Sequence, residues 1–204
     1  MRGIQEKSFG RRCLETLIEV ATPILAFLSP GCVESYTVTP RIGLNVPVEQ
    51  TNPNIEFDSA VKYGVGGGFK TRDGTEWELG IDFFQTRGDT VASKTTSDVS
   101  TVTLGAKIPL FEKGRKTLFV TPQLCSYAET ARTELIALPG MGYTENCGSL
   151  GYGFAIGTRF NGKSNGDGKG TSFNVEARYR RFSNLNNMYR GSDLEVDVGA
   201  TFVF

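Results

Sequence analysis

The chain has 204 residues, in which 22 Lys and Arg residues balance 22 Asp and Glu residues, and it contains no histidine. The zero formal net charge gives no field that would attract nucleic acid or a charged substrate. No run of about 18 or more apolar residues occurs, which excludes a transmembrane helix. Transmembrane strands remain compatible with the sequence, because each needs only about 9–11 residues.

Residues 1–33 differ in composition from the rest of the chain. The basic stretch MRGIQEKSFGRRC is followed by the uncharged apolar run Val20–Leu28 and by SPGC, which ends at Cys32. This order is typical of a secretory signal, although two acidic residues and a proline around the apolar run depart from it. We therefore expect 1–33 to be an export signal or leader and 34–204 to form the folded domain. A short amphipathic helix is the alternative for 1–33, and lipidation at Cys32 is a weaker hypothesis.

From residue 35 onward, polar and apolar residues alternate along the chain. The first four segments of this kind are YTVTPRIGLNVPV (36–48), AVKYGVGGGFK (60–70), TEWELGIDFF (75–84) and STVTLGAKIPL (100–110). In each segment one row is mostly hydrocarbon, and the other carries charge, hydroxyl groups or glycine. A period of two predicts a β-strand whose two faces meet different surroundings.

The second half continues the same alternation. Its segments are TLFVTPQLCSY (117–127), GYGFAIGTRF (151–160), SFNVEARYRRF (172–182) and DLEVDVGATFVF (193–204). Helical periodicity appears nowhere after residue 33. The sequence therefore predicts eight amphipathic strands and no helix in the folded domain.

The connections between these segments alternate in length. Tight turns are expected at 71–75 and 112–116, a Gly-rich turn at 161–170, and longer loops at 48–59, 87–97, 129–150 and 183–192. With eight antiparallel strands, all the longer loops fall at the end opposite both termini. That asymmetry is typical of outer-membrane barrels.

Glycine indicates which row faces inward. The charged row also carries most of the strand glycines: Gly43, Gly64, Gly66, Gly68, Gly80, Gly105, Gly153, Gly157 and Gly199. An eight-stranded barrel has an interior only just wide enough for its side chains, whereas glycines on a solvated face would merely weaken the strands. We therefore expect the charged row to face the lumen and the hydrocarbon row to face lipid. The alternative is a soluble lipocalin-like binding barrel with its charged row in water.

Charges inside a barrel need partners, because an unpaired buried charge is very costly. On the rows expected to face inward, positively and negatively charged residues occur in nearly equal numbers. The predicted lumen charge network is Arg41, Lys62, Glu76, Glu78, Asp82, Lys107, Arg159, Glu176, Arg178, Arg180, Asp193, Glu195 and Asp197.

The chain from about Ser35 to Phe204 resembles the small bacterial outer-membrane β-barrels of the OmpA/OmpX-like, porin-like family. Such proteins end in a polar–x–Gly–x–x–aromatic–x–Phe signal that the barrel assembly machinery reads, and the matching residues here are Asp197, Gly199, Phe202 and Phe204. The resemblance implies an all-β fold, an eight-stranded antiparallel up-and-down transmembrane β-barrel. It also implies an integral location in the bacterial outer membrane, in contact with its lipid and with lipopolysaccharide.

Motifs for catalysis or for cofactor binding are weak. The segment Gly157–Ser164 matches the letters of a phosphate-binding loop, but a Gly-rich stretch and another strand follow it where a helix is needed. Without histidine, the usual proton carrier near neutral pH is missing. We therefore expect neither an enzyme nor a bound cofactor or metal. Cys125 and Cys147 form a hypothetical disulfide, with two free thiols as the alternative.

These observations favour a structural or interaction barrel, monomeric and without a nucleic-acid partner. It would display four surface loops for adhesion, envelope integrity or ligand contact. The loop expected at 129–150 is the largest and is mildly apolar, which suits a surface partner. A narrow porin-like channel for small solutes is the alternative, which we rank second because long paired side chains leave little open bore.

Overall fold

The computed structural model describes residues 33–50, 56–90, 92–138, 140–162, 170–182 and 190–204. The leader expected at 1–33, with Cys32, lies outside these residues except for Val33. The described strands are β1 (Val33–Gln50), β2 (Glu56–Phe57), β3 (Ala60–Thr71), β4 (Glu76–Asp89), β5 (Ser93–Lys113), β6 (Lys116–Leu135), β7 (Gly142–Asn161), β8 (Gly170–Phe182) and β9 (Arg190–Val203). Among the described residues, none belongs to a helix that has the length and apolar character to cross a membrane.

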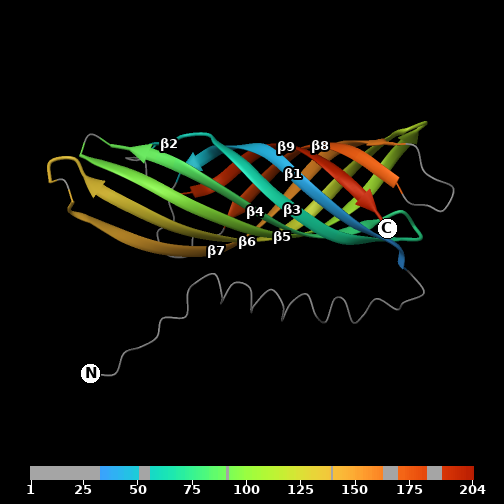
Figure 1. The fold of residues 1–204 in the computed structure, drawn as a ribbon, viewed down its shortest axis with the longest axis horizontal. Helices are drawn as coiled ribbons and strands as arrows, with labels where there is room; N and C mark the ends of the chain where they lie inside the picture. Colours follow the sequence, from blue (N-terminus) through green and yellow to red (C-terminus); the bar gives the residue numbers. More distant parts are fainter. Residues whose placement is uncertain (1–32, 51–55, 91, 139, 163–169, 183–189) are drawn as a thin grey trace, which may run out of the picture.

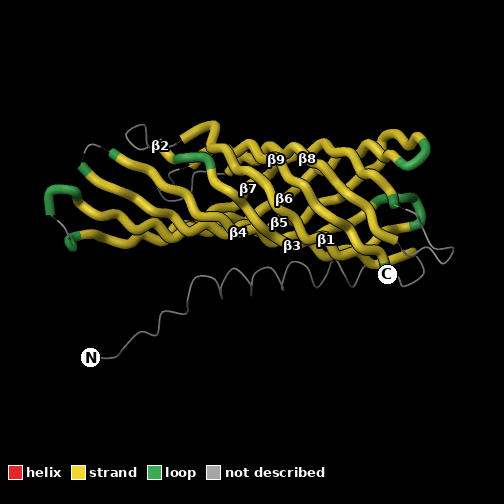
Figure 2. The backbone as a smooth tube through the Cα atoms, turned by 45° about the horizontal axis from the view of Figure 1, so that its top comes forward, coloured by secondary structure: helices red, strands yellow, loops and turns green. Residues whose placement is uncertain are grey.

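The long strands close into a barrel (Figures 1 and 2). Each of them pairs antiparallel with its neighbour, and β1 closes the sheet by pairing with both β3 and β9. The short strand β2 adds only Glu56 and Phe57 to the end of β4. The predicted fold class, an eight-stranded antiparallel up-and-down β-barrel, is confirmed.

The two predicted tight turns are also confirmed. β3 and β4 are joined through Gly74 at φ 87°, and β5 and β6 through Gly114 at φ 62°, a left-handed conformation that favours glycine. In the first turn, Asp73 accepts hydrogen bonds from the hydroxyl groups of Thr71 and Thr75. These bonds stabilise the carboxylate and lower the pKa of Asp73.

Burial alternates along each strand, with the charged row buried and the apolar row exposed. On β8, Arg178 is 1% exposed, whereas Phe173 and Val175 on the opposite row are 59% and 44% exposed. Hydrocarbon is therefore the outer surface of the barrel, and charge lies within it. This arrangement is the reverse of a water-soluble protein.

The expected loops at 87–97 and 129–150 are wrong, because strands occupy most of both segments. β4 continues to Asp89 and β5 begins at Ser93, while β6 continues to Leu135 and β7 begins at Gly142. Residues 85–89, 93–100, 128–135 and 142–149 form an extension of β4–β7, here called the arm, at the end of the barrel opposite the C-terminus (Figure 1). The arm carries polar residues on both faces, and so its strands lack the apolar–polar contrast that marked the others.

Candidate functional site

The centre of the lumen is an ion-pair network around Asp82 on β4. Arg41 on β1 donates to this carboxylate twice, from Nε to Oδ1 at 2.7 Å and from Nη2 to Oδ2 at 3.2 Å. Its remaining nitrogen, Nη1, donates to Glu78 at 2.6 Å. Three further cations approach Asp82 Oδ2, at distances of 3.8 Å for Lys62, 3.9 Å for Arg178 and 3.9 Å for Arg180. Asp82 is therefore the common partner of cations from three other strands.

The network continues across the lumen from β4 to β9. Lys107 Nζ on β5 lies 2.9 Å from Glu78 Oε2 and 2.9 Å from Glu176 Oε1. Glu176 also accepts from Arg178 at 2.7 Å, and Arg178 Nε lies 3.2 Å from Asp197 Oδ2. Alternating signs thus link strands on opposite walls of the barrel.

Lys62 on β3 closes the network against β9. Its ammonium nitrogen lies 2.5 Å from Glu195 Oε2 and 2.8 Å from Asp197 Oδ1. Asn45 donates to Glu195 at 3.0 Å and to Asp193 at 3.1 Å. Arg180 forms an ion pair with the other oxygen of Glu195. The structure thereby places the residues of the expected charge network in the lumen. Arg159 and Glu76 form a separate pair nearer the C-terminus.

These charged side chains leave little room for water beside them. The side chains of Lys62, Asp82, Arg180 and Glu195 are each 0% exposed. A side chain that lines an aqueous channel would be accessible to solvent. The middle of the lumen is therefore packed solid by its own ion pairs.

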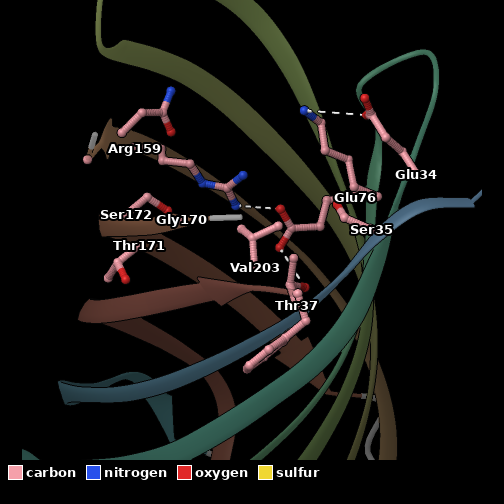
Figure 3. Close-up of a pocket in the computed structure, with 13 residues that line it drawn as sticks. Glu34, Ser35, Thr37, Glu76, Arg159, Gly170, Thr171, Ser172 and Val203 are labelled. Carbon is pink, nitrogen blue, oxygen red and sulfur yellow. Dashed lines mark hydrogen bonds and ion pairs between the residues drawn. The ribbon is translucent and has the colours of Figure 1, made fainter. Parts of the chain in front are cut away.

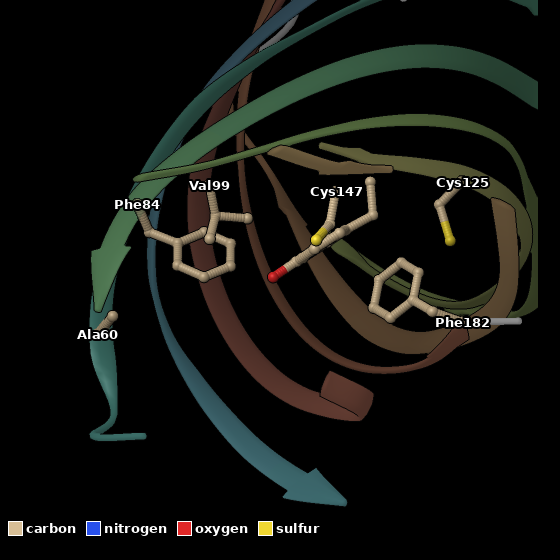
Figure 4. Packing of buried hydrophobic residues seen from close by; sticks show 7 residues of the cluster. Ala60, Phe84, Val99, Cys125, Cys147 and Phe182 are labelled. Atoms are coloured by element: carbon tan, nitrogen blue, oxygen red, sulfur yellow. The ribbon is translucent and has the colours of Figure 1, made fainter. Parts of the chain in front are cut away.

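An apolar cluster lies in the lumen on the arm side of the network (Figure 4). The ring of Tyr127, 0% exposed, packs on that of Phe182 with centroids 4.8 Å apart, and its hydroxyl donates to Glu129 at 2.9 Å. The cluster, here called the plug, consists of Ala60, Phe84, Val99, Cys125, Tyr127, Cys147 and Phe182. It separates the ion pairs from the arm end of the barrel.

A cavity of about 660 Å³ opens at the other end of the lumen, near the C-terminus (Figure 3). Glu76 and Arg159 pair across it at 2.6 Å, and Arg159 Nε also donates to Asn174 at 3.0 Å. Nearer its rim, Lys70 lies 3.9 Å from Glu34. The lumen is thus a polar cup that is open toward the C-terminus and closed toward the arm.

The hypothetical disulfide is wrong, because Cys125 and Cys147 are both free thiols. In the β6–β7 register, Cys125 stands opposite Gly151 and Cys147 opposite Glu129. The two cysteines are thus offset by four residues along the strands, about 13 Å. A disulfide requires Cα atoms within about 7 Å of each other. Both thiols instead contribute to the plug.

Aromatic side chains gather at two levels of the outer surface. Toward the arm, Tyr63 and Phe83 have ring centroids 6.1 Å apart, as do Phe154 and Tyr179. The outward aromatics nearer the C-terminus are Tyr36, Phe111, Phe160, Phe173, Phe202 and Phe204, all at least 41% exposed. Two aromatic levels with aliphatic residues between them are the pattern of a barrel that crosses a bilayer.

The proposed assembly signal divides between the two faces of β9. Asp197 and Gly199 face the lumen opposite Gly43 and Arg41 of β1. Phe202 and Phe204 are exposed on the outside, at 41% and 63%. The reading of these residues by an assembly machinery stays a prediction.

The aromatic residues of the plug and Asn45 were not among the residues predicted from the sequence. Phe84 and Phe182 each follow a lumen charge by two residues, and so extending the inward row toward the arm would have found them. Asn45 lies on the inward row of β1, but its side chain carries no charge to draw attention to it.

Small side chains on the inward row make room for the ion pairs, which gives a prediction with a matched control. A Cβ atom added to Gly80 would collide with the guanidinium of Arg41, whereas one added to the outward Gly67 would meet nothing within 4 Å. Gly80→Val is therefore expected to lower the free energy of unfolding by about 1–3 kcal/mol through overpacking. Gly67→Val should leave it within about 0.5 kcal/mol. Urea unfolding in detergent micelles measures both, and equal effects would contradict this role of Gly80.

Two examples illustrate the solved structures that share this architecture. The structure of Neisserial surface protein A (NspA), from Neisseria, is 14% identical, with 83% of this chain and 97% of that chain covered and a TM-score of 0.51. The structure of Ail, the attachment invasion locus protein of Yersinia pestis, in complex with the heparin analogue sucrose octasulfate, is 18% identical. It covers 84% of this chain and 99% of that chain, with a TM-score of 0.53. No protein-family model and no curated protein sequence matches the chain. The chain therefore has the fold of the small eight-stranded outer-membrane β-barrels.

Proposed function

We propose that this protein is an integral, closed barrel of the bacterial outer membrane that serves as a scaffold for the arm. The observation that carries the proposal is the inverted distribution of side chains, with hydrocarbon outside and buried ion pairs inside. An apolar surface all round a barrel is stable in lipid and unstable in water. A soluble lipocalin-like binder would need the opposite arrangement.

The packed lumen favours a scaffold over a channel. A conducting barrel needs a continuous row of water, and the side chains of Lys62, Asp82 and Arg180 at mid-lumen are inaccessible to water. The plug adds a second barrier on the arm side. The cup near the C-terminus therefore has no open path through the lumen.

An enzymatic role has little support in the lumen. The buried carboxylates of Asp82, Glu176 and Glu195 lie against cations, which holds them as structural ion pairs. A general acid or base needs a group that can exchange its proton with a substrate. We therefore propose that these carboxylates stabilise the fold and take no part in catalysis.

The arm is the part of the protein that we propose to meet a surface partner. The turn between β6 and β7, at the tip of the arm, exposes Ile136, Leu138 and Met141, and Tyr143 at the start of β7 is exposed as well, each about half accessible. These apolar side chains replace the loop that the sequence predicted at 129–150 as the contact surface. The barrel itself is proposed to be monomeric, to be inserted by the barrel assembly machinery, and to contact lipid and lipopolysaccharide.

Conductance in a planar lipid bilayer tests the closed lumen. We expect the refolded protein to insert without stepwise conductance, because its ion pairs and plug occupy the bore. The double variant Phe84→Ala/Phe182→Ala, which thins only the plug, should stay closed because the ion pairs remain. Regular conductance steps from the wild-type protein would contradict the scaffold proposal and favour the narrow channel.

A further inference from the structure

A groove of about 870 Å³ crosses the outer surface of β3–β7, where the aromatic level meets the arm. Ala128 faces outward on β6 yet is only 9% exposed, and it therefore lies at the floor of the groove. The outward-facing residues that line the groove are Val61, Tyr63, Phe83, Gln85, Asp98, Ser100, Ala128, Thr130 and Asn146.

The two sides of the groove differ in chemistry. Val61, Tyr63 and Phe83 continue the apolar surface of the barrel and are 44–63% exposed. On the arm side the groove is lined by hydroxyl, amide and carboxylate groups. Gln85 there donates to Asp98 at 2.7 Å, and Thr130 donates to Asn146 at 2.9 Å. Each of these amides keeps further donor or acceptor capacity for a ligand.

We propose that this groove binds the sugar portion of a glycolipid from the leaflet in which it lies. The inference rests on the proposed membrane location. At that level, the acyl chains of the lipid would lie along Tyr63 and Phe83, and its head would reach the polar half of the groove. A molecule that is apolar at one end and rich in hydroxyl groups at the other matches both sides.

The charges of the groove favour a sugar over a phosphate as its ligand. Among the outward-facing residues that line it, Asp98 is the charged one, and Arg132 beside it already lies 3.6 Å from Asp98 Oδ2. A phosphate would meet a carboxylate there, with no cation of the lining to bind it. Sugar hydroxyls can instead donate to Asp98 and exchange hydrogen bonds with Gln85 and Asn146.

The test compares lipids that differ in the amount of sugar they carry. The full chain, refolded in detergent micelles, is titrated with rough lipopolysaccharide that carries core sugars, with lipid A alone, and with phosphatidylethanolamine, and bound lipid is counted by native mass spectrometry. We expect the sugar-rich lipid to bind most tightly. Gln85→Leu/Asn146→Leu should weaken its binding about tenfold, because two hydrogen-bonding groups are lost. Thr144→Leu, an outward threonine of the arm that is not part of the groove lining, is the control and should leave binding unchanged.

The outcomes separate this site from the proposed function. Each sample is first run on an SDS gel with and without boiling, which reports whether the barrel has folded. A folded wild type that binds phosphatidylethanolamine as tightly as the sugar-rich lipid, or a folded double variant that binds like the wild type, would overturn the glycolipid site alone. A wild type that forms no heat-sensitive barrel would overturn the site together with the proposed membrane location.

Discussion

Asp82→Asn is expected to lower the free energy of unfolding of the barrel by about 3–5 kcal/mol, the usual effect of breaking a buried ion pair. Arg41 directs two of its nitrogens at this carboxylate, and Lys62, Arg178 and Arg180 also lie within 4 Å of it. The neutral amide keeps the size of the side chain and removes its charge. The four cations would then remain buried with one anion fewer to balance them.

Urea unfolding of the refolded protein in detergent micelles, followed by tryptophan fluorescence, measures this loss. Asp98→Asn is the matched control, because Asp98 pairs with Arg132 at 3.6 Å on the exposed arm, and such pairs contribute less than about 1 kcal/mol. The double variant Asp82→Asn/Arg41→Gln should lose less than the sum of its single changes, since both remove the same pair. Equal effects of Asp82→Asn and Asp98→Asn would contradict a central role for Asp82.

Ile156→Arg is expected to lower the free energy of unfolding in a lipid bilayer by about 2–4 kcal/mol. Ile156 lies on the outward row of β7, midway between Tyr152 and Phe160, and is 48% exposed. If the belt between the two aromatic levels faces lipid, this position lies near the middle of the bilayer. A guanidinium there would lose its hydration without gaining a partner.

Thr144→Arg places the same charge on the same strand and face, but within the arm. This control should change the free energy of unfolding by less than about 0.5 kcal/mol, because the arm is proposed to lie in water. Folding titrations in phospholipid vesicles compare the two variants. Equal stability of the two variants would mean that Ile156 does not face lipid. The assignment of the outer surface to a lipid environment would then be wrong.

The fold could be predicted because the two rows of each strand differ so strongly. Segments such as 173–180 alternate polar with apolar residues at every step, and the glycines of the charged row show which side is crowded. Alternation and crowding are local properties, and they can be recognised directly in the sequence. The arm could not be predicted in the same way, because hydroxyl-bearing residues such as Thr95, Ser97 and Thr133 occupy its inward positions and its outward residues are polar as well.

The partners within the lumen were harder to predict than its residues. Their positions, late in one expected strand and just before the next, placed Cys125 and Cys147 near one end of the barrel. Only the β6–β7 register shows that they are four residues apart along the strands. The same holds for Asp82, whose central place depends on the stagger between β4, β1 and β8. Register is set by turns and closure of the whole barrel, and a single sequence does not display it.

The most direct test of the account is the migration of the protein on SDS gels before and after boiling, using outer-membrane fractions from cells that express the whole chain. A closed barrel with an apolar outer surface should appear in the outer-membrane fraction, resist SDS when unboiled, and shift in migration when heated. That result would establish the outward hydrocarbon face and the membrane location together. A protein that is recovered in the soluble fraction and shows no shift would contradict both, and the outward hydrocarbon row would then need another explanation.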